Sequence, residues 1–220
     1  MLYQLSYQVF YEAANIKLSF GSARCFIYFF SFFFYRSVIL HFSFFCSMKI
    51  FLIGLSGTGK SSIGKQLASR LKVNFMDTDA IIEKSKEKSI SEIFKNDGES
   101  YFRKLELEFL QELANKPELD GVVATGGGMP CFNDNIARMK ELGLLIHFTV
   151  PIEILESRLK KSTHRPLLKD NLMENLKSQF NDRNSYYSKA DLSVQTENWN
   201  AQKMADLLKK LNQIDSIRPT

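Results

Sequence analysis

This chain of 220 residues has few cysteines and no long run of charges of one sign. The three cysteines, Cys25, Cys46 and Cys131, follow no metal-binding spacing and form no disulfide framework. The net charge is +5, and no block of like charge suggests a tail that binds nucleic acid. Internal repeats are absent as well. These absences argue against a zinc module, a disulfide scaffold and a repeat protein, and they favour a reducing cytoplasm.

One glycine-rich stretch stands out, and it follows a short apolar run from Ile50 to Ile53. Gly54 is followed by four residues and then by Gly59-Lys60-Ser61, which is the spacing of a phosphate-binding loop. Glycines let successive backbone N–H groups turn toward a phosphate, and a following helix adds its positive dipole end. The alternative is a strand-to-helix turn with no ligand. The strand before the loop and the amphipathic pattern after it favour the phosphate loop.

Phenylalanine is concentrated before Met48, where eleven of the nineteen lie. The densest part, Cys25 to Cys46, is long enough to span a bilayer, but Arg36 in its middle would cost about 3 kcal/mol. Lys17 and Arg24 would keep the N-terminus in the cytoplasm, so a single span would place the phosphate loop outside the cell, away from ATP. A secretory signal also fits poorly, because no small-residue cleavage site follows the apolar run. We therefore expect residues 1–47 to be an extension outside the fold, and residues 48–220 to be the domain; a membrane anchor is the alternative.

Two carboxylates, Asp77 and Asp79, come at the end of the second predicted strand, Val73 to Asp77. Ligands bind at the carboxyl ends of strands in open α/β sheets. Asp79 also fits a helix N-cap, because Ala80 to Glu83 continues as a helix. We expect the pair to serve Mg²⁺ and a substrate hydroxyl.

Farther along, the sequence predicts a helix from Gly98, with a capping box at Ser89 to Glu92 before it. By periodicity alone, Arg103 is a solvated charge on that helix. Gly126, Gly127 and Gly128 directly follow a buried strand, which indicates a tight turn or the close approach of a ligand.

Strands alternate with helices throughout, which predicts an α/β fold with a parallel sheet covered on both faces. The remaining predicted elements are strands at 121–125, 144–150 and 192–194 and helices at 133–142, 152–160, 172–189 and 201–211. His147 falls inside a strand and is expected to be structural. Residues 161–170 show no hydrophobic periodicity, so we expect either a loop that closes over phosphates or a solvated linker.

In this order, the motifs from Met48 to about Leu211 resemble those of the shikimate kinase family. The motifs that carry the resemblance are the phosphate loop, Asp77-Thr-Asp79, Gly98-Glu-Ser-Tyr-Phe-Arg103, the three glycines, Arg165-Pro-Leu-Leu168, and Arg183 with Tyr187. The loop alone is shared by many folds, whereas the combination is specific. The resemblance implies a three-layer P-loop kinase fold with a five-stranded parallel sheet and a mobile lid.

The resemblance also implies a reaction: transfer of the γ-phosphoryl group of ATP, with Mg²⁺, to the 3-hydroxyl of shikimate, by a cytoplasmic monomer. The residues implied to bind ATP are Gly57, Thr58, Gly59, Lys60, Ser61, Ser62, Arg158 and Arg165. Those implied to bind shikimate are Asp79, Arg103, Gly126, Gly127, Gly128 and Arg183. Ser61 and Asp77 would hold the metal, and Lys60, Asp79 and Arg165 would be catalytic.

The chain departs from the family where proline often follows the last strand, beside the adenine, since Gln195 to Asn200 contains none. A gluconate- or nucleotide-directed kinase is one rival interpretation, and the paired arginines and three glycines weigh against it. A nucleotide-binding switch without catalysis is another, although Lys60, Asp79 and Arg165 are all present.

Overall fold

The computed structural model describes residues 49–116, 119, 121–160 and 171–217. The strands are β1 Lys49–Ile53, β2 Asn74–Asp77, β3 Gly121–Ala124, β4 Gly143–Thr149 and β5 Leu192–Gln195. The helices are α3 Lys60–Leu71, α4 Thr78–Lys86, α5 Ile90–Asn96, α6 Glu99–Ala114, the 3₁₀ turn η2 Met129–Cys131, α7 Asn135–Leu142, α8 Ile152–Lys160, α9 Leu172–Tyr187 and α10 Ala201–Ile217.

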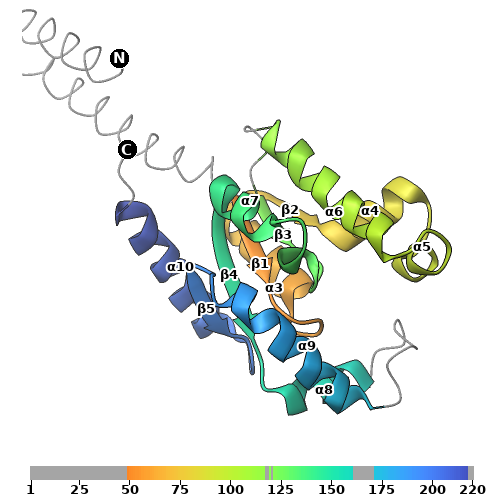
Figure 1. The fold of residues 1–220 in the computed structure, drawn as a ribbon. Helices are drawn as coiled ribbons and strands as arrows, with labels where there is room; N and C mark the ends of the chain where they lie inside the picture. Colours follow the sequence, from red (N-terminus) through yellow and green to blue (C-terminus); the bar gives the residue numbers. More distant parts are fainter. Residues whose placement is uncertain (1–48, 117–118, 120, 161–170, 218–220) are drawn as a thin grey trace, which may run out of the picture. The chain divides into compact units, whose positions relative to one another are not determined.

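The five strands form one parallel sheet in the order β2-β3-β1-β4-β5 (Figure 1). The central strand β1 is buried along its whole length, with Ile50 paired to Val122 on one side and Leu144 on the other. A strand covered on both faces carries apolar side chains at every position, which explains the unbroken run from Ile50 to Ile53.

Alternate residues of β1 enter two separate cores. Phe51 and Ile53 pack into a core that side chains of α6, α7 and α9 complete. Ile50 and Leu52 pack into the other core, which α3 and α10 complete. Helices therefore cover both faces of the sheet, and the predicted three-layer arrangement is confirmed.

A third, smaller core joins α4, α5 and α6 through Ile82, Ile93, Phe102 and Leu105. The predicted capping box is present at the start of α5: Ser89 Oγ accepts from the N–H of Glu92, and Glu92 accepts from the N–H of Ser89. This core fixes the first turns of α6, and with them the position of Arg103.

Several element boundaries differ from the prediction. Helix α7 begins at Asn135 and not at Asn133, because Asn133 and Asp134 have left-handed φ values of 52° and 56°. The last helix, α10, continues to Ile217, beyond the predicted end at Leu211. The proposed extension, residues 1–47, and the proposed lid, residues 161–170, lie outside the described residues. Within the described part of the chain, no helix combines the length and apolar character needed to cross a membrane.

Candidate active site

The predicted phosphate loop connects β1 to α3 at the carboxyl end of the sheet. Gly54 has a φ of 135°, and a β-carbon there would lie 2.5 Å from the carbonyl oxygen of Phe148. Only glycine fits this turn. Gly59 precedes α3 and makes no side-chain cap. The first N–H groups of α3 are therefore not satisfied by a capping side chain, and they suit an anion.

Lys60 curls back over this loop. Its Nζ donates hydrogen bonds of 2.8 Å to the carbonyl oxygens of Gly54 and Leu55, and the residue is only 8% exposed. The loop, Lys60, Asp79 and Arg158 line a pocket of about 380 Å³. The structure thus places a buried ammonium group at the floor of a hollow that has room for phosphates.

Ser61 and Asp77 meet at one edge of this pocket, where Ser61 Oγ donates a 2.5 Å hydrogen bond to Asp77 Oδ2. A hydroxyl and a carboxylate are oxygen donors of the kind that Mg²⁺ prefers. Asp77 also caps α4, because its Oδ1 accepts from the N–H of Ala80. The expectation that Asp79 could be the helix cap is wrong: the helix begins two residues earlier, so Asp79 lies in its first turn.

The three glycines after β3 lie against the charged side chains of three helices. A β-carbon on Gly126 would lie 2.7 Å from Asp79 Oδ1, and one on Gly128 would lie 2.8 Å from Arg103 Nη2. At Gly127 the corresponding distance to Arg183 Nη1 is 3.3 Å. Three helices, α4, α6 and α9, therefore bring one carboxylate and two guanidinium groups against consecutive glycines. The predicted substrate residues are brought together.

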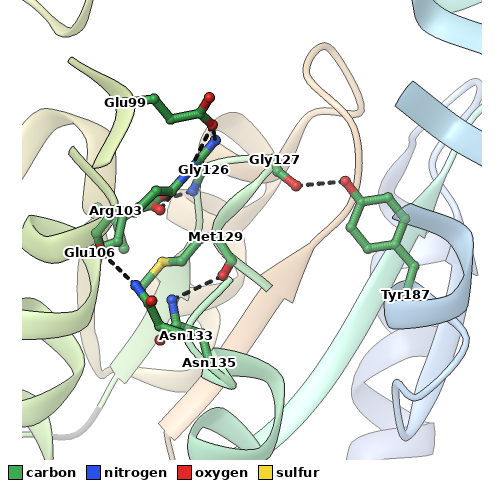
Figure 2. A network of polar contacts seen from close by, with 10 residues as sticks. Glu99, Arg103, Glu106, Gly126, Gly127, Met129, Asn133, Asn135 and Tyr187 are labelled. Carbon is green, nitrogen blue, oxygen red and sulfur yellow. Dashed lines mark hydrogen bonds and ion pairs between the residues drawn. The ribbon is translucent and has the colours of Figure 1, made fainter. Parts of the chain in front are cut away.

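Arg103 is held by two carboxylates of its own helix (Figure 2). Its Nη1 donates to Glu106 at 2.8 Å, and its Nη2 and Nε donate to Glu99 at 2.8 and 3.1 Å. Burial alone would lower the pKa of Arg103, but Glu106 and Glu99 outweigh it, so the pKa is raised. The side chain is only 13% exposed, so the interpretation of Arg103 as a solvated charge is wrong. Hydrophobic periodicity did not reveal the burial of Arg103, because the residues that surround it are partly polar.

Glu106 is a site residue that the sequence reasoning missed. It is completely buried, and burial raises the pKa of its carboxyl to about 7, although the nearby Arg103 acts to lower that pKa. Asp79 and Glu99 raise it further. A signal was available in the sequence: Glu106 lies four residues after Phe102, on the apolar face of the helix.

Tyr187 supports the middle glycine. Its hydroxyl donates a 2.6 Å hydrogen bond to the carbonyl oxygen of Gly127 (Figure 2), and burial raises the pKa of Tyr187 to about 12. The ring of His147 lies 4.9 Å from that of Tyr187. Burial, and then Lys60, lower the pKa of His147 to about 4, so this histidine is neutral at pH 7. Its burial within β4 agrees with the structural role predicted for it.

The loop is fixed from two further directions. Arg158, at the other side of the pocket, donates from Nη1 to the carbonyl oxygen of Gly57 at 3.0 Å. Thr196, which the sequence reasoning missed, is 1% exposed and donates a 2.6 Å hydrogen bond to the carbonyl oxygen of Thr58. Ser62 Oγ donates to the carbonyl oxygen of Gly59. Arg165 lies outside the described residues.

A parallel five-stranded sheet with a phosphate loop after its central strand, and charged side chains gathered at three glycines near that loop, is the arrangement of a P-loop kinase for small molecules. The comparisons with known proteins agree. The sequence model of the family described as Shikimate kinase matches residues 56–212. The chain belongs to the shikimate kinase family.

Individual relatives give the extent of the match. The chain is 41% identical over 153 residues to the shikimate kinase of Clostridium botulinum strain Okra, covering 69% of this chain and 89% of the relative. The solved shikimate kinase of Bacteroides thetaiotaomicron aligns with a TM-score of 0.69 at 32% identity, covering 77% and 99% of the two chains. That of Acinetobacter baumannii, solved in complex with shikimate, aligns with a TM-score of 0.67 at 30% identity, covering 79% and 96%.

Proposed function

We propose that this chain transfers the γ-phosphoryl group of ATP to the 3-hydroxyl of shikimate, giving shikimate 3-phosphate and ADP, as a step of aromatic amino-acid biosynthesis. Membership of the shikimate kinase family supports this reaction. The observation that carries it is the convergence of Arg103, Arg183 and Asp79 on the three glycines, across from the phosphate loop. The two guanidinium groups suit the single carboxylate of shikimate, and Asp79 suits one of its hydroxyls.

Arg103 and Arg183 bind the substrate carboxylate in this proposal. A guanidinium group has five N–H bonds in a rigid plane. Within the described residues, Arg103 uses three of them for Glu99 and Glu106, which leaves one on each terminal nitrogen. A carboxylate accepts from such a pair with both oxygens. The glycines let the charged side chains lie directly against the backbone, because a β-carbon at Gly128 would be 2.8 Å from Arg103 Nη2.

Asp79 orients the attacking hydroxyl and accepts its proton. It lies beside Gly126 and lines the pocket that also contains Lys60. Phosphoryl transfer depends mostly on positioning and on stabilising the charge of the transferred group. A carboxylate fixed between the acceptor site and the phosphate loop satisfies the first requirement.

The phosphates of ATP bind the amides of Gly57, Thr58, Gly59 and the following residues, Ser61 and Ser62 among them. Lys60 exchanges its carbonyl partners for phosphate oxygens and stabilises the charge of the transferred group. Arg158 stacks on the adenine, and Arg165, outside the described residues, meets the transferred phosphoryl group. Ser61 and Asp77 would hold Mg²⁺, which neutralises charge on the β- and γ-phosphates when it is bound.

We further propose that the protein acts as a cytoplasmic monomer without a nucleic-acid or membrane partner. The requirement for ATP supports a cytoplasmic location, because ATP is available there. Light scattering of the purified chain at micromolar concentration tests the monomer, and a mass of twice the monomer would contradict it.

A coupled assay that measures ADP release tests the reaction. The full chain receives MgATP with shikimate, with gluconate or with a nucleoside monophosphate. We expect turnover with shikimate and none with the other two acceptors, because only shikimate joins a carboxylate to ring hydroxyls in the required geometry. Turnover with gluconate or the nucleotide instead would replace this proposal by another kinase. ATP binding with no turnover on any acceptor would favour a nucleotide-binding switch.

A further inference from the structure

Phe132 lies in the loop after the three glycines, and 37% of it is exposed. Its ring centroid is nevertheless only 4.0 Å from Cζ of Arg103. Two other rings are near the same guanidinium group, Phe102 at 5.4 Å and Phe94 at 5.9 Å. Phe132 is therefore the nearest of the three rings, and it stacks on the cation of the acceptor site.

The loop that carries Phe132 is closed by two hydrogen bonds from Asn135. It follows the short turn η2, and the buried side chain of Asn135 donates a 3.0 Å hydrogen bond to the carbonyl oxygen of Met129. The backbone N–H of Asn135 donates to the carbonyl oxygen of Phe132 at 2.9 Å. These two bonds fix the backbone on both sides of Phe132, and with it the point from which the ring projects.

The same loop also binds the backbone of Arg103. Asn133 Nδ2 donates a 3.0 Å hydrogen bond to the carbonyl oxygen of Arg103 (Figure 2). Residues 132 and 133 therefore contact both ends of Arg103, with a side-chain amide at its carbonyl and a ring at its guanidinium. Neither contact comes from α6, to which Arg103 belongs.

We propose that Phe132 is a positioning residue for substrate binding, which holds the guanidinium plane of Arg103 at the angle where its two remaining N–H groups meet the substrate carboxylate. The inference rests on the proposed function, since it assumes that Arg103 binds that carboxylate. An aromatic ring over a cation contributes most when water is excluded, and the side chain of Arg103 is only 13% exposed. Loss of the ring should therefore weaken substrate binding about 3- to 30-fold.

The test compares three variants of the full chain. Phe132→Leu removes the aromatic face, Phe132→Tyr retains it, and Tyr101→Leu removes an aromatic residue of equal exposure, 37%, from α6. Steady-state rates give kcat and the KM for each substrate, and calorimetry gives the Kd for shikimate. We expect Phe132→Leu to raise the KM and Kd for shikimate, with the kcat and the KM for ATP kept. Phe132→Tyr and Tyr101→Leu should resemble the unaltered chain.

A double-mutant cycle with Arg103→Gln shows whether Phe132 acts through Arg103. If it does, Phe132→Leu should change the shikimate Kd by less than about twofold when the guanidinium group is already absent. Equal effects in both backgrounds would overturn the proposal. So would an unchanged KM in Phe132→Leu, or a parallel fall of kcat, ATP affinity and Tm, which indicates a structural role. Failure of the unaltered chain to phosphorylate shikimate would instead overturn the proposed function.

Discussion

Asp79 and Glu106 face the same glycine from two different helices. A β-carbon on Gly126 would lie 2.7 Å from Asp79 Oδ1 and 3.1 Å from Glu106 Oε1. Among the described residues, Glu106 Oε1 accepts no hydrogen bond, whereas Glu106 Oε2 accepts from Arg103. Gly126 therefore lies against two carboxylates that differ in burial. The less buried one, Asp79, lies beside the phosphate loop.

Glu106 should make the stability of the protein depend on pH. Its pKa is about 7 in the fold, against 4.5 as the reference for the unfolded chain. Between these values the folded state holds a proton that the unfolded state releases. The free energy of unfolding therefore falls as pH rises from about 4.5 to 7, by at most about 3 kcal/mol from this group, and this contribution is constant above pH 7.

Urea unfolding of Glu106→Gln at pH 5 and pH 8 checks this prediction. The variant should lose part of the difference between the two pH values. Glu108→Gln is the control, because Glu108 belongs to the same helix and its side chain is 45% exposed. If Glu106→Gln kept the full pH dependence, Glu106 would not be the group responsible.

Tyr187→Phe should weaken shikimate binding without changing ATP binding. The variant removes the hydroxyl that bonds to Gly127, and it leaves a partly buried carbonyl oxygen without this donor. Such a loss costs about 1–3 kcal/mol of stability. The KM for shikimate should rise by up to about tenfold, and thermal unfolding should show a lower Tm. If Tyr187→Phe lowered the Tm but left the KM for shikimate unchanged, Tyr187 would have no role in substrate binding.

Lys60→Met should lower kcat by about 10² or more, because the charge beside the transferred phosphoryl group is lost while the stem volume is similar. The control is Lys65→Met, since Lys65 is an exposed residue of the same helix. Steady-state kinetics of both variants decide the matter. Near-normal turnover of Lys60→Met would rule out the assigned role.

Arg183→Ala should weaken the binding of shikimate but not that of ATP. Loss of a charged, hydrogen-bonded partner costs about 2–5 kcal/mol, or roughly 30- to several-thousand-fold in shikimate affinity. ATP affinity in the absence of shikimate should hardly change. Calorimetric titrations with each ligand measure both. Arg165→Ala should show the contrasting behaviour, with lower turnover and shikimate affinity largely kept. Equal losses of both affinities in Arg183→Ala would indicate a structural residue.

A chain that begins at Met48 should be folded and active. The described domain has its cores within residues 49–217, and the composition changes sharply at Met48. Circular dichroism and the coupled assay on the shortened and full chains check this. A shortened chain that failed to fold while the full chain folded would show that residues 1–47 contribute to the domain.

The sheet was predictable because its signals are local. The apolar run before Gly54 predicts β1, and the loop and capping-box motifs depend on residues three to seven positions apart. The positions of Lys60 and Ser61 follow from the phosphate-loop motif, and that of Asp77 follows from its place at the end of the second predicted strand. These parts of the site agree with the structure.

The remaining parts depend on contacts between distant segments. Arg103 appeared solvated because its helix shows polar neighbours, whereas its burial comes from Gly128 and Phe132. Thr196 carries no motif, and its bond to Thr58 depends on the pairing of β5 with β4. No pattern within one segment contains this information.

The hydrogen bond between Thr196 and Thr58 joins residues 138 positions apart, and it brings the end of β5 to the phosphate loop. Because synthesis runs from the N-terminus, the phosphate loop is made well before β5. A growing chain can therefore form β1, α3 and the glycine turn well before this support is present. Completion of the nucleotide site in its final form coincides with completion of the sheet, so the loop acquires its last fixed contact only when nearly the whole domain has been released.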